Sequence, residues 1–308
     1  MNKLIIIGVA VAIIVMLVSL TYMNYLKTIP QQPSTNITPA TDISNVLLEG
    51  AGATFVYPQL NEWAQLFYAQ KGVKINYQSV GSGAGLSMFF QNVTDFACSD
   101  PPLSKDIWAR YNGSILQIPW VAGAVAIVYN IPDLPLDTAL RLDGSVLTGI
   151  YRGDIVYWDD PRIKSLNPDI AERLPHKEII PVYRTDASGT TEIFTIFLYK
   201  STDGLWPKDL VGKTVNWPVS ATGRAVGGKG NEGVAQAVMQ TPYTIGYVER
   251  SYVISNNIAV ASIKNAAGVF VSPSNESIML SLENAEIPQS PLDDFSEIVY
   301  QIVYSPGE

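Results

Sequence analysis

The chain has 308 residues, of which 47% are apolar and 16% charged, and its formal net charge is −8. A single cysteine excludes a disulfide scaffold and a metal site built from clustered cysteines, and a single histidine excludes a multi-histidine zinc centre. Nucleic-acid binders carry a basic face, so the net negative charge argues against nucleic acid as a partner. The composition favours an exported or membrane-anchored globular protein with little catalytic hardware, and we expect no cofactor.

The amino-terminal end has the form of an export or anchoring segment. Lys3 is followed by an apolar run, Leu4–Leu20, which is interrupted only by Gly8 and Ser19. A run of this length is close to the ~20 residues that span a bilayer. It also exceeds the usual apolar core of a cleaved signal peptide. We therefore expect residues 1–27 to be a retained membrane anchor with the body on the extracytoplasmic side; a cleaved signal is the alternative.

Residues 28–46 predict an extended linker, because they are rich in Pro, Thr, Ser and Gln and lack an apolar period. From residue 47 onward, short apolar runs alternate with glycine-containing turns and amphipathic stretches. The predicted elements are a strand from Leu47, a helix over Tyr57–Gln70, a strand over Lys74–Val80, a helix ending at Phe90, strands over Thr94–Cys98, Val121–Tyr129 and Ile179–Tyr183, a helix after Thr191, a helix over Val234–Gln240 and a strand over Thr244–Val248. This alternation is typical of an α/β fold.

Three turns share one design, in which small and hydroxyl-bearing residues directly precede or begin a predicted helix. They are Ala53–Phe55, Gly81–Gly83 and Ser188–Thr190, and their hydroxyl groups belong to Thr54, Ser82, Ser188 and Thr190. Unpaired N–H groups at the start of a helix bind anions, and the hydroxyls can add hydrogen bonds. Ordinary helix capping explains any one of these turns. Three in one chain favour a site for a polyvalent oxyanion.

Charged residues accompany these turns. Arg184 lies two residues before Asp186, directly ahead of the third turn. Its planar donor fork suits an oxyanion, although a domain-stabilising ion pair is the alternative. Asp100 follows a short strand, and its carboxylate can accept the proton of monohydrogen phosphate while repelling fully ionised sulfate. A helix N-cap ahead of Pro101 is the alternative for Asp100.

Other chemistries fit the sequence poorly. Gly81–Gly85 resembles part of a dinucleotide fingerprint, but its third glycine comes one residue early and Leu86 stands where glycine or alanine is required. Ser188 lacks the first glycine of a nucleophile elbow, and His176, in a predicted loop, is the only imidazole. No carboxylates have the spacing of a metal-binding loop, so we expect no metal site and no catalytic residue.

Several collinear motifs make the chain similar to a known family. They are Gly50–Phe55 (GAGATF), Gly81–Gly85 (GSGAG), Asp95–Asp100 (DFACSD), Tyr183–Thr191 (YRTDASGTT) and Gly227–Gly233 (GGKGNEG). Together they resemble the phosphate-binding proteins of phosphate ABC importers, the PstS family. The resemblance implies a two-lobed fold of the type II periplasmic-binding-protein kind, whose lobes close about a hinge over one phosphate. It also implies ABC transporter permease subunits as partners and no covalent chemistry.

The resemblance further implies a division of the body. We expect the first lobe within residues 47–130 and the second within 131–308. In the family the chain returns to the first lobe after the second. Here residues 297–304 are the expected approach to that return and only four residues follow, so we expect the first lobe to lack its return strand and to expose an apolar edge.

The family's binding groups carry over residue by residue. The implied phosphate site comprises donors from Thr54, Phe55 and Ser82, the proton acceptor Asp100, the guanidinium of Arg184 held by Asp186, and the third turn with Ser188, Gly189 and Thr190. Ala187 replaces a common glycine without removing a ligand group. A phosphate-monoester hydrolase with Ser188 as nucleophile and a phosphate-sensing surface protein are the alternatives.

Overall fold

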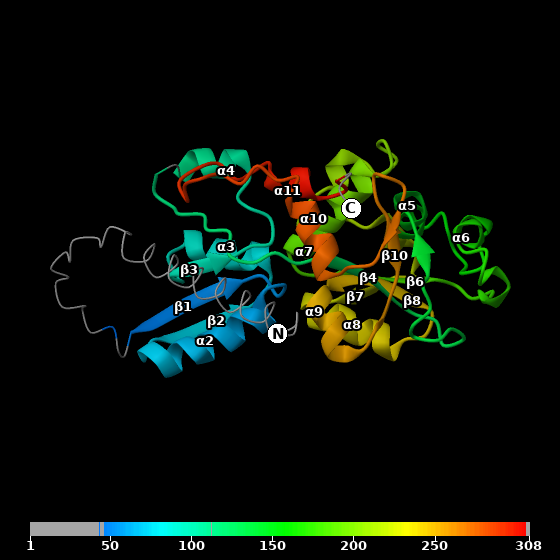
Figure 1. Cartoon of the computed structure of the whole chain (residues 1–308), viewed down its shortest axis with the longest axis horizontal. Coiled ribbons are helices and arrows are strands. Elements are labelled where there is room, and N and C mark those ends of the chain that lie inside the picture. Colours follow the sequence, from blue (N-terminus) through cyan, green and yellow to red (C-terminus); the bar gives the residue numbers. More distant parts are fainter. Residues whose placement is uncertain (1–42, 44–45, 112, 306–308) are drawn as a thin grey trace, which may run out of the picture. The chain divides into compact units, whose positions relative to one another are not determined.

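The computed structural model describes residues 43, 46–111 and 113–305 (Figure 1). The predicted anchor, 1–27, and most of the predicted linker, 28–46, lie outside the described residues. Within the described residues, no helix combines the length and the apolar character that crossing a bilayer requires. The fold described below belongs to the compact unit that follows residue 44.

A small parallel sheet forms the first part of this unit. Its strands are β1 (Leu47–Gly52), β2 (Lys74–Ser79) and β3 (Phe96–Cys98), in the order β2-β1-β3. Helices α2 (Tyr57–Lys71) and α3 (Ser82–Phe90) lie on opposite sides of it (Figure 1). Because parallel strands end at the same edge of a sheet, the turns that follow β1, β2 and β3 meet there.

Glycine permits the close contact between α3 and this sheet. A Cβ atom on Gly85 of α3 would lie 2.2 Å from the Cα of Gly52 in β1. Gly52 itself has φ +146°, and a Cβ there would lie 2.1 Å from the carbonyl oxygen of Cys98. Larger residues at these positions would push α3, and the turn that begins it, away from the strand ends.

A larger mixed sheet forms the second part, with the order β7-β6-β8-β4-β9. Its strands are β4 (Val125–Asn130), β6 (Ile180–Arg184), β7 (Val226–Gly228), β8 (Thr244–Glu249) and β9 (Ala259–Val260). Strand β6 runs parallel to β7 and β8, whereas β4 runs antiparallel to β8 and β9. Helices cover both faces, which confirms the predicted α/β class.

The residues of β4, β6 and β8 alternate between two cores. Val128, Val182 and Val248 pack against α8 (Gly230–Gln240) and α9 (Arg250–Asn256) on one face. The alternate residues of these strands point to the other face, where they form a larger core with α5 (Gly144–Arg152) and α7 (Gly189–Lys200). The larger sheet is therefore the rigid part on which β6 presents Arg184 and α7 presents its first turn.

The remaining elements complete the unit. They are α4 (Lys105–Tyr111), β5 (Arg141–Leu142), α6 (Pro161–Leu166), β10 (Ser262–Lys264), β11 (Phe270–Val271), α10 (Asn275–Leu282), α11 (Ile298–Ile302) and short 3₁₀ turns at Ala171–Arg173, Lys208–Leu210 and Pro218–Thr222. Strands β11, β10 and β5 form a third, small sheet.

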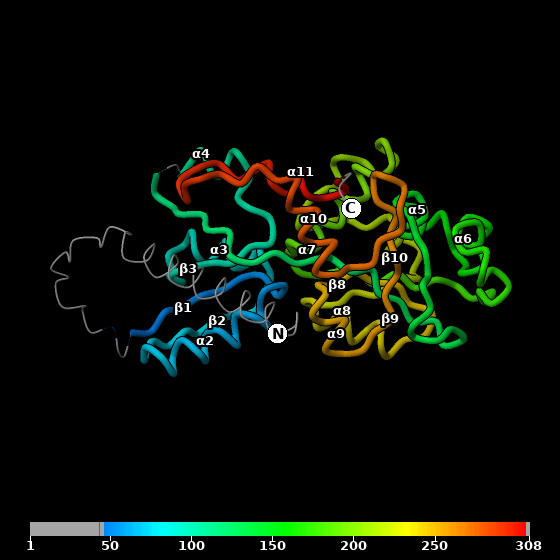
Figure 2. Tube along the Cα trace, viewed as in Figure 1, coloured from blue at the N-terminus to red at the C-terminus, as the bar shows by residue number. Residues whose placement is uncertain are grey.

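Strand β4 lies just before the predicted division after residue 130, and it belongs to the larger sheet. The predicted strand 121–129 begins only at Val125, and it pairs with β8 and β9 of the larger sheet. Two hydrogen bonds reach the carboxyl-terminal part of the chain. The backbone N–H of Gln117 donates to the carbonyl of Pro291, and the indole N–H of Trp108 donates to the carbonyl of Asp293. The segment after α10 thus lies beside α4 (Figure 2), so it contacts residues predicted in the first lobe.

An apolar cavity of about 1350 Å³ is lined by the small sheet and this last segment, and also by residues of β4 and α7. Its lining includes Phe90, Phe96, Ile118, Phe295 and Val299. Ile118 is 65% exposed although it lines this cavity. The small sheet therefore has a much looser apolar environment than the larger one.

Trp217 tests the importance of the larger core. It is 2% exposed, and its ring lies 5.0 Å from Tyr151 and 5.5 Å from Trp206 between ring centroids. We expect Trp217→Ala to cost about 3–5 kcal/mol of unfolding free energy, because it leaves a large cavity. Trp217→Phe should cost clearly less, since the indole N–H has no hydrogen-bond partner among the described residues. Urea unfolding measures both, with the exposed Leu136→Ala as a control; equal stability of Trp217→Ala and wild type would contradict this core.

Candidate functional site

The structure brings the three predicted turns and Asp100 together. The turns after β1 and β2 supply Thr54, Phe55 and Ser82, and the turn after β3 supplies Asp100. The first turn of α7 meets them: the hydroxyl of Thr190 donates to Asp100 Oδ2 at 3.1 Å. This contact joins residues that lie 90 positions apart in the sequence.

The second and third turns also touch directly through their backbones. Gly83 N–H donates to the carbonyl of Ala187 at 2.9 Å. A Cβ on Gly83 would lie 2.4 Å from the Cβ of Ala187, and one on Gly189 would lie 2.5 Å from the hydroxyl oxygen of Ser82. Glycine is required at both positions because no side chain fits between the turns.

Backbone donors line this junction. Among the described residues, the N–H groups of Phe55, Ser82, Gly189 and Thr190 have no hydrogen-bond acceptor. Buried backbone N–H groups are nearly always paired in proteins, so four unpaired ones in one place indicate a site for an acceptor that is not part of the chain. Two of the groups belong to the first turn of α7, where the helix dipole adds positive potential.

Arg184 supplies the formal positive charge. Its side chain is 1% exposed, and its Nε and Nη2 donate to the two carboxylate oxygens of Asp186 at 2.8 and 2.5 Å. Its Nη1 donates to Thr190 Oγ1 at 3.4 Å. Burial opposes the ionisation of Asp186, but the Arg184 guanidinium and the N–H of Gly230 stabilise the carboxylate and lower its pKa. The pair fixes the guanidinium plane at the junction.

Asp100 is the acceptor of the site. Burial raises the pKa of its carboxyl to about 7, although the Thr190 hydroxyl and the charge of Arg184 favour the ionised form. The residue is partly exposed as a whole, but its Oδ1 atom is shielded from solvent and has no hydrogen-bond partner among the described residues. An unpaired, buried carboxylate oxygen in a ring of donors can accept a proton from a bound oxyanion.

The hydroxyl groups differ in what they can offer. The Ser188 hydroxyl oxygen accepts from Thr191 N–H at 3.1 Å as the N-cap of α7, so its proton is free to donate. The predicted donor Thr190 is different, because its proton goes to Asp100. The nearest strong acceptor is that carboxylate, so the Thr190 hydroxyl connects Arg184 to Asp100 instead of facing outward.

Several residues that hold the site are not predicted by the sequence motifs. Asn231 donates from its backbone and side chain to Thr54 Oγ1, and the Tyr252 hydroxyl donates to the Thr54 carbonyl at 2.7 Å. The Tyr247 hydroxyl oxygen accepts a hydrogen bond from the backbone N–H of Arg184 at 3.1 Å. The motif Gly227–Gly233 contains Asn231 and spans the start of α8. It could have drawn attention to Asn231, although the motif carries no obvious ligand group.

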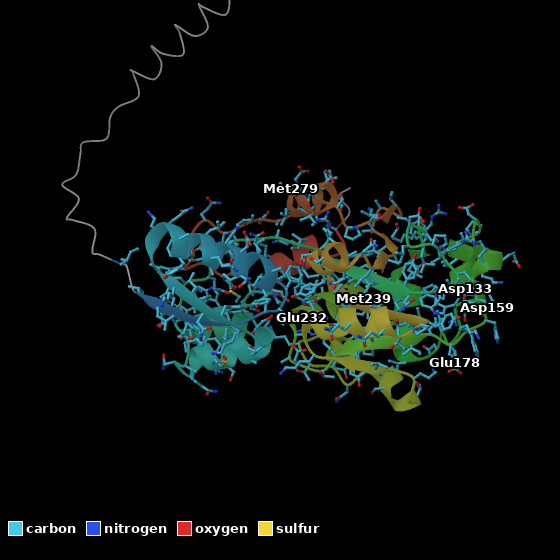
Figure 3. All side chains as sticks on the ribbon, turned by 90° about the horizontal axis from the view of Figure 1, so that it is seen from below. Asp133, Asp159, Glu178, Glu232, Met239 and Met279 are labelled. Atoms are coloured by element: carbon cyan, nitrogen blue, oxygen red, sulfur yellow. The ribbon has the colours of Figure 1, made fainter. Side chains whose placement is uncertain are left out.

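The single histidine, which a catalytic or metal site could use, lies away from this junction. His176 is on an exposed loop, where its Nδ1 lies 3.0 Å from Asp159. Figure 3 shows Asp159 far along the body from Glu232, whose Oε1 lies 2.8 Å from the Tyr252 hydroxyl oxygen. Within the described part of the chain, no three His, Cys, Asp or Glu side chains are grouped to hold a metal ion.

The fold and this ring of anion donors are of the solute-binding kind, and a family model described as a PBP superfamily domain matches residues 31–307. "Phosphate-binding protein PstS" of Methanocaldococcus jannaschii is 42% identical over 283 residues, which cover 90% of this chain and 71% of that protein. The protein of the same name from Haemophilus influenzae is 42% identical over 240 residues, covering 78% and 69%. The chain therefore belongs to the PstS family of phosphate-binding proteins.

Solved structures agree with this fold. A high-affinity periplasmic phosphate-binding protein (PfluDING), solved with phosphate bound, is 26% identical with a TM-score of 0.58, over 78% of this chain and 68% of that one. A phosphate-binding protein from Stenotrophomonas maltophilia has the same TM-score at 22% identity, over 83% and 72%. The second likeness concerns the fold alone.

Asp100 should make phosphate-free stability depend on pH. Its folded pKa, about 7, lies above the ordinary value of 3.8 for an aspartate, so its unfavourable ionisation lowers stability as pH rises from about 4 to 7. Between pH 5 and pH 8 this is worth on the order of 2 kcal/mol. Asp100→Asn should lose that part of the pH dependence in urea unfolding without phosphate. An identical pH dependence in the two proteins would contradict the raised pKa.

Proposed function

We propose that this protein binds inorganic phosphate on the extracytoplasmic side of the membrane and delivers it to the permease subunits of an ABC importer. The carrying observation is the unpaired Oδ1 of Asp100 beside four unpaired backbone N–H groups. The names of the relatives support the ligand. PfluDING is described as periplasmic, which supports the location.

The proposed site divides the work among nine residues: Thr54, Phe55, Ser82, Asp100, Arg184, Asp186, Ser188, Gly189 and Thr190. Backbone N–H groups and the hydroxyls of three of them donate to the phosphate oxygens. Arg184 supplies positive charge at low dielectric, where it is worth more than in water. Asp186 acts indirectly, by holding the Arg184 guanidinium, and the Thr190 hydroxyl acts indirectly, by holding the Asp100 carboxylate.

Asp100 provides the selectivity in this proposal. Monohydrogen phosphate carries one proton, which it can donate to Asp100 Oδ1. Sulfate has the same shape but no proton at neutral pH, so its oxygen would face a carboxylate oxygen with no hydrogen between them. A site that leaves a buried group unpaired and opposes like charges rejects the wrong ligand strongly.

Closure of two lobes is the proposed functional step, with the small sheet in one lobe and the larger sheet in the other. The contact of Gly83 with Ala187 then belongs to the closed form. We place the hinge in the segment that leads into β4. There Gly123 packs closely against the first turn, since a Cβ on it would lie 2.7 Å from the Phe55 ring, and the Ala124 carbonyl accepts the backbone N–H of Arg250 at 3.0 Å. We also propose that residues 1–27 anchor the protein in the membrane.

A phosphate-monoester hydrolase is not favoured, since the PstS relatives are named as binding proteins. The Ser188 hydroxyl oxygen contacts the N–H of Thr191, and no histidine or carboxylate among the described residues bonds to it as a base. A phosphate-sensing surface protein would use the same site, and it differs in lacking a permease partner.

Calorimetry with phosphate and sulfate tests the ligand. The full chain should bind phosphate and give no saturable heat with equimolar sulfate. Asp100→Asn should weaken phosphate binding and reduce the discrimination, because an amide can donate to a sulfate oxygen. Arg184→Ala should weaken phosphate binding at least about 30-fold, since a buried dianion loses a charged partner. Equal heats for the two anions in wild type would refute the role of Asp100.

Replacing a glycine at the contact between the turns tests closure. Gly83→Ala should weaken phosphate binding about tenfold or more, because its Cβ would meet that of Ala187 at 2.4 Å and hold the turns apart. Gly212→Ala is the matched control, since a Cβ there meets nothing within 4 Å and should leave affinity unchanged. Phosphate calorimetry measures both; equal affinities would mean that the two turns need not touch for binding.

A further inference from the structure

We propose that Asn231 is a positioning residue that makes the Thr54 hydroxyl a pure donor toward the bound oxyanion. The inference rests on the proposed function, because it concerns the protonation state of the phosphate that the site accepts. Two hydrogen bonds join these two residues, which lie 177 positions apart in the chain.

Thr54 Oγ1 accepts two hydrogen bonds from the same residue. The Asn231 backbone N–H donates at 3.1 Å and its side-chain Nδ2 donates at 2.8 Å. Asn231 is fully buried at the start of α8, and Thr54 is 3% exposed. A threonine hydroxyl has two lone pairs and one proton, so both of its acceptor positions are taken. What remains is the proton, which has to be donated.

The orientation of the Asn231 amide is fixed from its other end. Its Oδ1 accepts the Glu249 N–H at 2.9 Å, so the amide nitrogen has to face Thr54. Turning the amide over would bring two donors together at Glu249. The Glu249 side chain is held in turn as the N-cap of α9 by the N–H of Ser251 at 2.7 Å.

The Thr54 proton points to the ligand by elimination. Among the described residues, no acceptor receives it. The Thr54 carbonyl is held by the Tyr252 hydroxyl at 2.7 Å, so the residue is fixed at its backbone as well as at its side chain. The donated hydrogen bond is therefore available to an oxyanion in the ring of donors that also contains Phe55 N–H.

A donor-only Thr54 limits how many protons the ligand can carry. The hydroxyls of Ser82 and Ser188 already accept from Asp100 N–H at 3.4 Å and from Thr191 N–H at 3.1 Å. Asp100 Oδ1 is then the acceptor for one ligand proton. The Ser82 and Ser188 hydroxyls each keep one lone pair, whereas Thr54 keeps none, so a second ligand proton beside Thr54 would face a donor. The site should favour monohydrogen phosphate over dihydrogen phosphate, and Asn231 contributes to that preference.

Asn231→Asp reverses the polarity at Thr54 with little change of shape. The introduced carboxylate can only accept, so it takes the Thr54 proton and turns a lone pair toward the phosphate. Phosphate calorimetry on the full chain at pH 8 and pH 6 measures the consequence. At pH 8 we expect a loss of about 10- to 100-fold in affinity. At pH 6 the loss should shrink several-fold, because the freed lone pair can accept the second proton of dihydrogen phosphate.

Controls separate this role from a structural one. Asn130→Asp alters another amide that bonds to carbonyls away from the site, including that of Val238 at 2.8 Å, and should leave affinity unchanged at both pH values. Asn231→Ala removes one of the two donors and should shift the pH preference in the same direction by less, which keeps the test open if the aspartate variant does not fold. In a Thr54→Val background, which has no hydroxyl to reorient, adding Asn231→Asp should reduce phosphate affinity by less than about threefold.

The outcomes are distinguishable. Wild type that does not bind phosphate would overturn the proposed function and this inference together. Wild type that binds while Asn231→Asp and Asn231→Ala keep its affinity and pH preference would overturn the inference alone. An equal loss at pH 8 and pH 6, or a full additional loss on Thr54→Val, would also overturn it, because Asn231 would then act on stability and not through the Thr54 hydroxyl.

Discussion

Arg184 is a buried cation, and burying a charge without a partner is costly enough to dictate its surroundings. The bidentate contact with Asp186 satisfies one side of the guanidinium. Asp186 is stabilised by the first N–H of α8 as well, so the start of that helix is fixed relative to the end of β6. A carboxylate, a guanidinium and a helix terminus thus form one rigid group, and the rest of the site is arranged around it.

From this group, hydrogen bonds extend in two directions. One passes through the Thr190 hydroxyl to Asp100, where the small sheet ends. The other passes along the start of α8 to Asn231 and then to Thr54, at the end of β1. In both directions each polar atom is either a donor or an acceptor with little freedom to change. The network therefore presents an oxyanion with donors at most positions and with one acceptor.

Much of this could be predicted from local sequence. Helix starts with small and hydroxyl residues show where free N–H groups will be, and the Arg184–Asp186 spacing indicates a cation with its own partner. The hydrogen bonds between distant segments could not be predicted this way. Asn231 reaches Thr54 only because two sheets present their turns to each other, and Thr190 turns inward only because Asp100 comes close. Strand β4 joined the larger sheet because its apolar residues alternate between two cores, which sequence pattern alone does not reveal.

The most direct test of this account is a crystal structure of the protein grown with phosphate. We expect one phosphate bound to the N–H groups of Phe55, Ser82, Gly189 and Thr190, with Arg184 in contact and one phosphate oxygen within hydrogen-bonding distance of Asp100 Oδ1. A phosphate bound away from these turns, or one whose oxygens avoid Asp100, would contradict it.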